Sequence, residues 1–217
     1  MKNGYTHITV ILDRSGSMEC IREDVIGGFN RYLHDQKEMT GTATLTLIQF
    51  DTQDPYEVVH HYRPIAEVPE LTRETYVPRA ATPLFDALGR CLNDVEKSLA
   101  DLPEGERPEG VVVVIITDGM ENSSRELRRD QVRRMVEAKK ARGWNFAFLS
   151  ADRDAILEAR DLGIDPDALL LFAKDAQGTA SAWAAASAAT SACRAEPKRK
   201  IGFKRTDRRH PDDPQRR

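Results

Sequence analysis

Short apolar runs, each stopped by a charged or small residue, recur along this chain and predict buried strands. The first covers residues 8–12 and ends at Asp13. The most apolar is the run VVVVII at 111–116, which is followed by Thr117 and Asp118. Runs this short and this rich in β-branched residues are typical of parallel strands covered on both faces. They therefore predict a sheet whose central strands end in carboxylates.

Helical periodicity and strand alternation predict the remaining elements. Apolar spacing favours helices over 19–37, from Thr82 to about Leu102, over 125–142, from Arg153 to about Leu162, and over 175–193. Alternation and apolar runs favour further strands over 42–50, 56–62, 144–149 and 168–172. The strands 42–50 and 56–62 are joined by a short link, which predicts an antiparallel hairpin. The element order is β-α-β-β-α-β-α-β-α-β-α.

Gly27 and Gly28 lie inside the first predicted helix. Each costs about 1 kcal/mol of helix stability relative to Ala. We interpret the pair as a place where the helix packs closely on the sheet, because the chain has no GxGxxG or Walker motif that would make it a phosphate loop.

Oxygen-bearing side chains follow the first strand in a loop of small residues. Asp13, Ser15 and Ser17 alternate there, at the carboxyl end of a strand, where open α/β sheets bind their ligands. A carboxylate and two hydroxyls are hard ligands that suit Mg²⁺ or Mn²⁺ and not zinc or copper. The loop is therefore a candidate metal site.

The segment Asp13-Arg14-Ser15-Gly16-Ser17 resembles the DxSxS signature of the von Willebrand factor A domain, which opens its metal ion-dependent adhesion site (MIDAS). In that family a Thr from a second loop and an Asp from a third complete the site. The segment TPLFDAL, which begins at Thr82 after two alanines, is similar to the second-loop motif, and Asp118 matches the third-loop Asp.

Each of these two residues also has a structural interpretation. Thr82 is a good helix N-cap with Pro83 at the first helical position, and a strand-end Asp such as Asp118 often forms a turn or caps a helix. Three matched segments in the family's order favour the ligand role. Asp86, one helical turn after Thr82, either orients the loop from behind the ligands or is an exposed helix acid, and the sequence leaves both open.

The resemblance covers about residues 6–193 and implies an α/β, Rossmann-like von Willebrand A domain. The expected sheet has six mostly parallel strands in the order 3-2-1-4-5-6, with the third strand antiparallel and helices on both faces. The expected metal ligands are Asp13, Ser15, Ser17, Thr82 and Asp118, bound directly or through water, with Mg²⁺ as the ion and Mn²⁺ as a second possibility. We place the domain at residues 1–193.

Residues 194–217 differ in composition from the rest of the chain. They hold ten Lys and Arg against four acids, a charge of +6, which leaves −9 for residues 1–193 of a chain with a formal net charge of −3. Proline recurs and apolar residues are few, so we predict a disordered basic tail. A solubilising role for this tail is at least as well supported as binding of nucleic acid, since aromatic residues for base stacking are scarce.

The family resemblance implies a module that binds a protein partner, with the metal ion taking up an Asp or Glu of that partner. A metal-dependent hydrolase is the first alternative, but none of the five histidines falls in the three motif loops and no Ser/His/Asp set is visible. We therefore expect no enzymatic activity. A nucleic-acid-associated protein acting through the tail is the second alternative.

The expected location is the cytoplasm. No apolar run approaches the ~20 residues that span a bilayer, the first residues lack the apolar core of a signal peptide, and three widely spaced cysteines suggest neither a disulfide framework nor a zinc site. We expect no membrane association.

Overall fold

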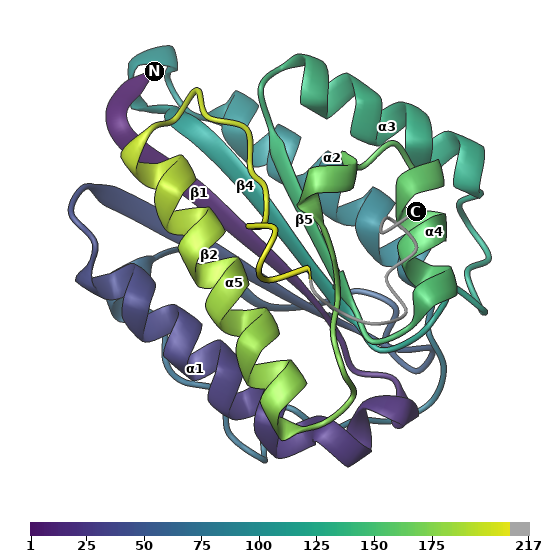
Figure 1. Ribbon diagram of the computed structural model, residues 1–217. Helices are drawn as coiled ribbons and strands as arrows, with labels where there is room; N and C mark the ends of the chain where they lie inside the picture. The colour runs from purple at the N-terminus through teal and green to yellow at the C-terminus, as the bar shows by residue number, and fades with distance from the viewer. Residues whose placement is uncertain (209–217) are drawn as a thin grey trace.

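A computed structural model, which describes residues 1–208, contains one six-stranded sheet in the order β3-β2-β1-β4-β5-β6 (Figure 1). Strand β3 is antiparallel to β2, and the other neighbouring pairs are parallel. The predicted strand order and the predicted antiparallel third strand are therefore confirmed. The strands are β1 (Lys2–Asp13), β2 (Thr42–Phe50), β3 (Glu57–Pro64), β4 (Pro108–Thr117), β5 (Asn145–Ser150) and β6 (Leu169–Leu171).

Helices cover both faces of this sheet. Helices α1 and α5 lie side by side on one face, and α2 and α3 lie behind the sheet in Figure 1. The α-helices are α1 (Arg22–Glu38), α2 (Leu84–Asp101), α3 (Arg129–Ala141), α4 (Arg153–Asp161) and α5 (Ala176–Ala195). Short 3-10 turns are η1 (Gly16–Ile21), η2 (Ile65–Glu67), η3 (Glu104–Glu106) and η4 (Pro166–Ala168). In the part of the chain described here, no helix has both the length and the apolar character needed to cross a membrane.

The centre of the sheet brings the two predicted carboxylate positions to one edge. Strand β1 pairs with β4 in parallel, with Leu12 opposite Ile116. Both strands are buried on both faces, as their continuous apolar runs predict. Because the strands run in the same direction and in this register, Asp13 and Asp118 lie near each other at the carboxyl edge of the sheet. The chain turns to opposite sides of the sheet from β1 and β4, and this is the switch point at which open α/β sheets bind ligands.

The close contact at Gly28 is made with a helix and not with the sheet. A Cβ built on Gly28 would lie 2.0 Å from Cδ1 of Trp183 in α5, whereas one on Gly27 would meet nothing within 4 Å. Trp183 itself is buried, and its ring contacts that of Phe29 edge-on and that of Tyr32 at a tilt. The interpretation of the glycine pair as a sheet contact was wrong, because a single sequence does not show which layer covers a helix.

The C-terminal segment is the main difference between expectation and structure. Helix α5 extends to Ala195, and beyond it Ile201 and Phe203 are buried, with 6% and 5% of their surfaces exposed. The Asn145 side chain holds this segment, because its Oδ1 accepts from Ile201 N at 2.8 Å and its Nδ2 donates to Arg199 O at 3.1 Å. The prediction of disorder from Arg194 onward is therefore wrong for residues 194–208. Its remainder, residues 209–217, lies outside the described residues.

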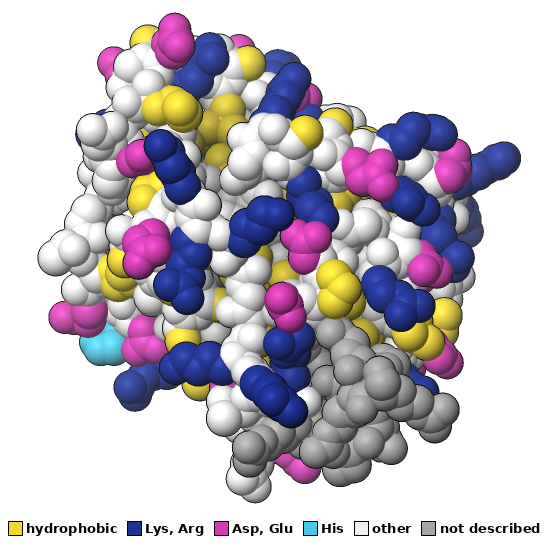
Figure 2. Space-filling model, turned by 45° about the horizontal axis from the view of Figure 1, so that its top comes forward, with side chains coloured by type: hydrophobic (Ala, Val, Ile, Leu, Met, Phe, Trp, Pro, Cys, Tyr) yellow, Lys and Arg dark blue, Asp and Glu magenta, His cyan; other side chains and the backbone are white. Residues whose placement is uncertain are grey.

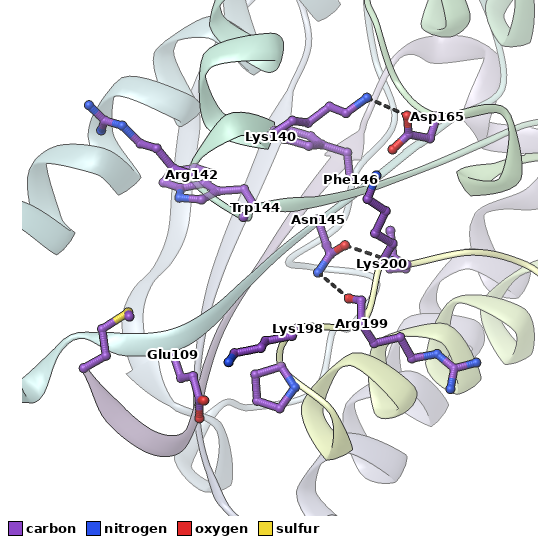
Figure 3. A pocket seen from close by; sticks show the side chains of 14 residues that line it. Glu109, Lys140, Arg142, Trp144, Asn145, Phe146, Asp165, Lys198, Arg199 and Lys200 are labelled. Carbon is purple, nitrogen blue, oxygen red and sulfur yellow. Dashed lines mark hydrogen bonds and ion pairs between the residues drawn. The ribbon is translucent and has the colours of Figure 1, made fainter.

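This segment lines one side of a cavity of about 480 Å³ beside the start of β5 (Figure 3). Trp144, Phe146, Lys140, Lys198 and Lys200 are among the residues that line it. The cavity therefore lies at the amino end of the strands, at the opposite edge of the sheet from Asp13 and Asp118.

Candidate metal centre

Three loops meet at the carboxyl edge of the sheet and are joined by backbone hydrogen bonds. The first loop, residues 13–17, pairs with the second, residues 79–82, through Arg79 N to Arg14 O at 2.8 Å and Gly16 N to Ala80 O at 3.0 Å. The second loop pairs with the third, residues 118–124, through Asn122 N to Thr82 O at 3.1 Å. The three motif segments found in the sequence thus form one surface.

Four of the five predicted ligands share one hydrogen-bonded network. The backbone N–H of Ser15 donates to Asp13 Oδ1 at 2.6 Å. The hydroxyls of Ser15 and Ser17 are 3.1 Å apart, and Ser17 Oγ donates to Asp118 Oδ1 at 2.7 Å. Asp13, Ser15 and Asp118 are buried, while Ser17 is exposed. Oxygens from the first and third loops are therefore gathered at a site that opens to solvent at Ser17.

The fifth predicted ligand, Thr82, is placed by its backbone. Its N–H donates to Asn122 Oδ1 at 3.0 Å, and only 3% of the residue is exposed. Helix α2 starts at Leu84 with Pro83 as its N-cap residue, without a capping side chain. Thr82 is therefore not the N-cap, and its hydroxyl makes no hydrogen bond within the described residues 1–208. A role for that hydroxyl as a ligand stays a prediction.

Asp86 is buried and holds the third loop. Its carboxylate accepts the backbone N–H groups of Arg125, Glu126 and Leu127 at 2.7, 3.0 and 2.8 Å, and 4% of the residue is exposed. Of the two interpretations of Asp86, the geometry matches the loop-orienting one. Helix α3 starts at Arg129 and not at the predicted residue 125, and the three N–H groups that Asp86 binds lie in the loop before it.

Glu121 has a comparable structural role in the third loop. Its carboxylate accepts from Ser123 N at 2.7 Å, from Ser124 N at 2.6 Å and, across to α2, from Phe85 N at 2.9 Å. These contacts turn both carboxylate oxygens toward the chain. Glu121 therefore stabilises the loop that carries Asp118.

Two residues that sequence reasoning missed hold Asp13. The Thr117 hydroxyl donates to Asp13 Oδ2 at 2.6 Å, and the Tyr76 hydroxyl donates to the Asp13 carbonyl at 2.7 Å. Thr117 directly precedes Asp118 on the strand beside β1, so its position offered a signal. Tyr76 lies in a long irregular loop, and nothing in its local sequence indicated this contact.

A buried ion-pair cluster joins the first two loops behind the site. Asp51 Oδ2 accepts from Arg14 Nε at 2.8 Å and from Arg79 Nε at 2.9 Å, and the Asp51 side chain is fully buried. Arg14, the variable second residue of the DxSxS segment, thus points away from the serines and anchors the loop. Because Arg14 belongs to the first loop and Arg79 to the second, the Asp51 carboxylate that they share ties the two loops together. Removing Asp51 would leave the buried Arg14 charge less compensated.

The site concentrates negative charge in a buried place. Burial raises the pKa of Asp13 to about 7, against the opposing effect of hydrogen bonds from Thr117 and Ser15, and the charge of Asp118 adds to the rise. The Lys174 ammonium lies 2.6 Å from Asp118 Oδ2. The site therefore already holds a cation in this structure, one supplied by the chain itself.

The donor set fits a hard divalent ion. The network consists of carboxylate and hydroxyl oxygens, without sulfur or imidazole nitrogen among Asp13, Ser15, Ser17, Thr82 and Asp118, and it attracts a positive group at Asp118. Oxygen-only sets of this kind suit Mg²⁺ and Mn²⁺.

Comparison with known proteins finds similarity at the level of structure alone. No family model matches the sequence, and no curated protein matches it. A von Willebrand factor type A protein from Catenulispora acidiphila superposes with a TM-score of 0.58 at 14% identity, covering 86% of this chain and 43% of that one. The manganese-loaded TRAP protein of Plasmodium vivax gives 0.57 at 16% identity, with 87% and 72% covered. The pilus adhesin SpaC of Lactobacillus rhamnosus GG gives 0.62 at 13% identity, with 87% and 30% covered.

These matches identify the fold as that of von Willebrand factor A domains. The chain spans less than half the length of the Catenulispora and Lactobacillus proteins.

Proposed function

We propose that this chain, which has the von Willebrand A fold, is a divalent-metal-dependent module that binds an acidic residue of a partner protein. The observation that carries the proposal is the network that joins Asp13, Ser15, Ser17 and Asp118 at the open switch point of the sheet. Asp13, Ser15, Ser17, Thr82 and Asp118 would hold the ion, with Mg²⁺ as the first candidate and Mn²⁺ as the second. Asp86 would position the third loop.

The bound metal would supply an electrophilic position for an outside oxygen. The chain's own residues prepare that position in two ways. The hydroxyls of Ser15 and Ser17 would contribute oxygens without adding negative charge. Two directly bound carboxylates would balance the charge of a dication, so the ion would stay electrophilic toward a partner's carboxylate when one of the two binds it through water. Thr117 and the backbone of Ser15 hold the Asp13 carboxylate in one orientation, which preserves the geometry when the partner leaves.

Binding is a better account of these residues than hydrolysis. The histidines that the structure describes lie on β1, α1 and β3 and not in the three loops, so the site lacks that common general base. The two carboxylates are engaged by Ser15, Thr117, Ser17 and Lys174. We therefore propose that the module is not an enzyme.

Nucleic-acid binding is supported less well. On the face drawn in Figure 2, Lys and Arg side chains are interspersed with Asp and Glu and do not form one continuous basic surface. Electrostatic binding to a nucleic acid backbone depends on such a surface.

We propose the cytoplasm as the place of action. Its support is that Cys20, Cys91 and Cys193 are free thiols, which fits a reducing compartment.

Affinity capture from the native host tests the proposal. Wild type and Asp13→Ala would be used as baits in parallel, each with Mg²⁺ and with EDTA. We expect a partner that is retained by wild type in Mg²⁺ and lost in the other three conditions. Equal retention in Mg²⁺ and EDTA would reject metal-bridged binding. Retention that falls with salt but is unchanged by EDTA would indicate the nucleic-acid alternative.

A further inference from the structure

Lys174 is the side chain through which the protein itself supplies a cation to the candidate site. Its Nζ lies 2.6 Å from Asp118 Oδ2, while the other oxygen of that carboxylate accepts from Ser17. Within residues 1–208, the ion pairs of the structure include no other cation bound to one of the five candidate ligands. The ammonium thus contacts the same carboxylate that the metal would use.

Lys174 reaches Asp118 from a part of the sheet two strands away. The residue follows β6, which is separated from β4 by β5, so its backbone starts about 10 Å from the strand that carries Asp118. Its turn is fixed because Asp175 caps α5 through Gly178 N at 2.7 Å and because a Cβ on Gly178 would lie 2.1 Å from Ala173 O. A long, straight side chain is required to reach Asp118 from this turn, and Lys provides it.

The two partners differ in their access to solvent. The Asp118 side chain is fully buried, whereas the Lys174 side chain is 37% exposed. The ammonium therefore approaches from the solvent side, where a metal ion would also enter. A lysine side chain with this exposure can place its ammonium in water while its stem stays against the protein.

Electrostatics disfavours simultaneous contact of this carboxylate with the ammonium and with a divalent ion. A buried carboxylate without a counter-ion is strongly unfavourable, so an uncharged residue at 174 would leave Asp118 uncompensated in the metal-free protein. Two cations that contact one carboxylate, whether through the same oxygen or through its two oxygens, repel each other at short range, where solvent screens little. The carboxylate is therefore balanced by one cation or the other.

We propose that Lys174 is a displaceable internal counter-ion that a divalent metal must replace at Asp118, so that the lysine sets how much free metal is needed to load the site. The inference rests on the proposed metal-binding function and adds its regulation. The site remains neutralised and folded at low metal concentration and becomes competent for an acidic partner only when the metal has displaced the lysine.

The test measures Mn²⁺ binding to the full chain by electron paramagnetic resonance of free Mn²⁺. Wild type is compared with Lys174→Met, which keeps the length of the side chain without the charge, and with Lys174→Gln, which can still donate a hydrogen bond. The matched control is Lys198→Met, an exposed lysine beside the cavity at the opposite edge of the sheet. We expect both Lys174 variants to bind Mn²⁺ at least about tenfold more tightly than wild type, and the control to be unchanged.

A second readout needs no metal. In EDTA, Lys174→Met should melt at a lower temperature than wild type and Lys198→Met, and Mn²⁺ should raise its melting temperature more than that of wild type. Equal or weaker Mn²⁺ binding by folded Lys174→Gln would overturn the exchange while leaving the proposed function intact. Absence of Mn²⁺ binding by wild type and all variants would contradict the proposed function and the exchange together.

Discussion

The hydroxyl of Thr117, the last residue of β4, donates a hydrogen bond of 2.6 Å to Oδ2 of Asp13, the last residue of β1. The bond crosses from one central strand to the next at the point where both leave the sheet. This bond holds the Asp13 carboxylate of the first loop, and its donor, Thr117, is adjacent to Asp118 of the third loop. Two loops of the candidate site are thus held together by the sheet itself.

Removing this hydroxyl should weaken metal binding without unfolding the domain. Groups that orient a ligand from behind typically contribute 10- to 100-fold in metal affinity, so we expect Thr117→Val to lose about tenfold or more in Mg²⁺ affinity by calorimetry. Thr9→Val is the matched control, because Thr9 is also a buried strand threonine and its hydroxyl has no hydrogen-bond partner in the described chain. Equal affinities for the two variants would show that Thr117 does not orient Asp13.

Asp86→Asn should destabilise the protein through the third loop. The amide replaces one acceptor oxygen by a donor that faces the N–H groups of residues 125–127, and a buried unsatisfied group costs about 1–3 kcal/mol. Urea denaturation should therefore show a loss of about 2 kcal/mol. Asp101→Asn, at the exposed end of the same helix, should change stability by less than about 0.5 kcal/mol. A stability loss no larger than that of Asp101→Asn would refute the anchoring role.

The adjacent glycines of α1 should respond in opposite directions to alanine. Gly27→Ala should stabilise by up to about 1 kcal/mol, because Ala is the better helix former and the added methyl meets nothing within 4 Å. Gly28→Ala should destabilise by about 1–3 kcal/mol, because its methyl would overlap the Trp183 ring. Denaturation curves of the two variants side by side decide the matter, and the same sign for both would contradict the observed packing of α1 on α5.

His7 should make the protein sensitive to acid. Burial lowers the pKa of His7 to about 3, with a smaller contribution from His61, so between about pH 6.5 and 3 the unfolded chain binds a proton that the folded chain does not. Stability should therefore fall as the pH decreases through this range, by roughly 5 kcal/mol in total for this one group.

The variant His7→Gln should show a flatter dependence of unfolding free energy on pH than wild type. His34→Gln, at an exposed position of α1, should keep the wild-type slope. Identical slopes for wild type and His7→Gln would mean that another group causes the acid sensitivity.

The sheet was predictable from the sequence because strands that are buried on both faces consist almost entirely of apolar residues. The run 111–116 falls within β4, and the run 42–50 matches β2. Apolar runs of this kind follow from strands being covered on both faces. The short link after residue 50 was sufficient to orient β3. Strand ends in such a sheet converge by geometry, so the first and third loops of the site were predictable as well.

Other features depend on contacts that a single sequence does not contain. The loop before α3 is held by the side chains of Asp86 and Glu121, and Asp86 lies 39 residues before Arg125, whose N–H it binds. The C-terminal segment looked disordered because its charge dominates its composition, yet two apolar residues and the Asn145 side chain hold it on the domain. Lys174 and Tyr76 likewise reach the site from segments without a motif.

The most direct test of the metal centre is anomalous X-ray diffraction from crystals of the full chain soaked in MnCl₂. We expect one strong anomalous peak at the carboxyl edge of the sheet, within coordination distance of the hydroxyls of Ser15 and Ser17 and close to Asp118, with Lys174 turned away from that carboxylate. A well-ordered crystal with no peak between these side chains, at Mn²⁺ concentrations that saturate known sites of this chemistry, would contradict the account.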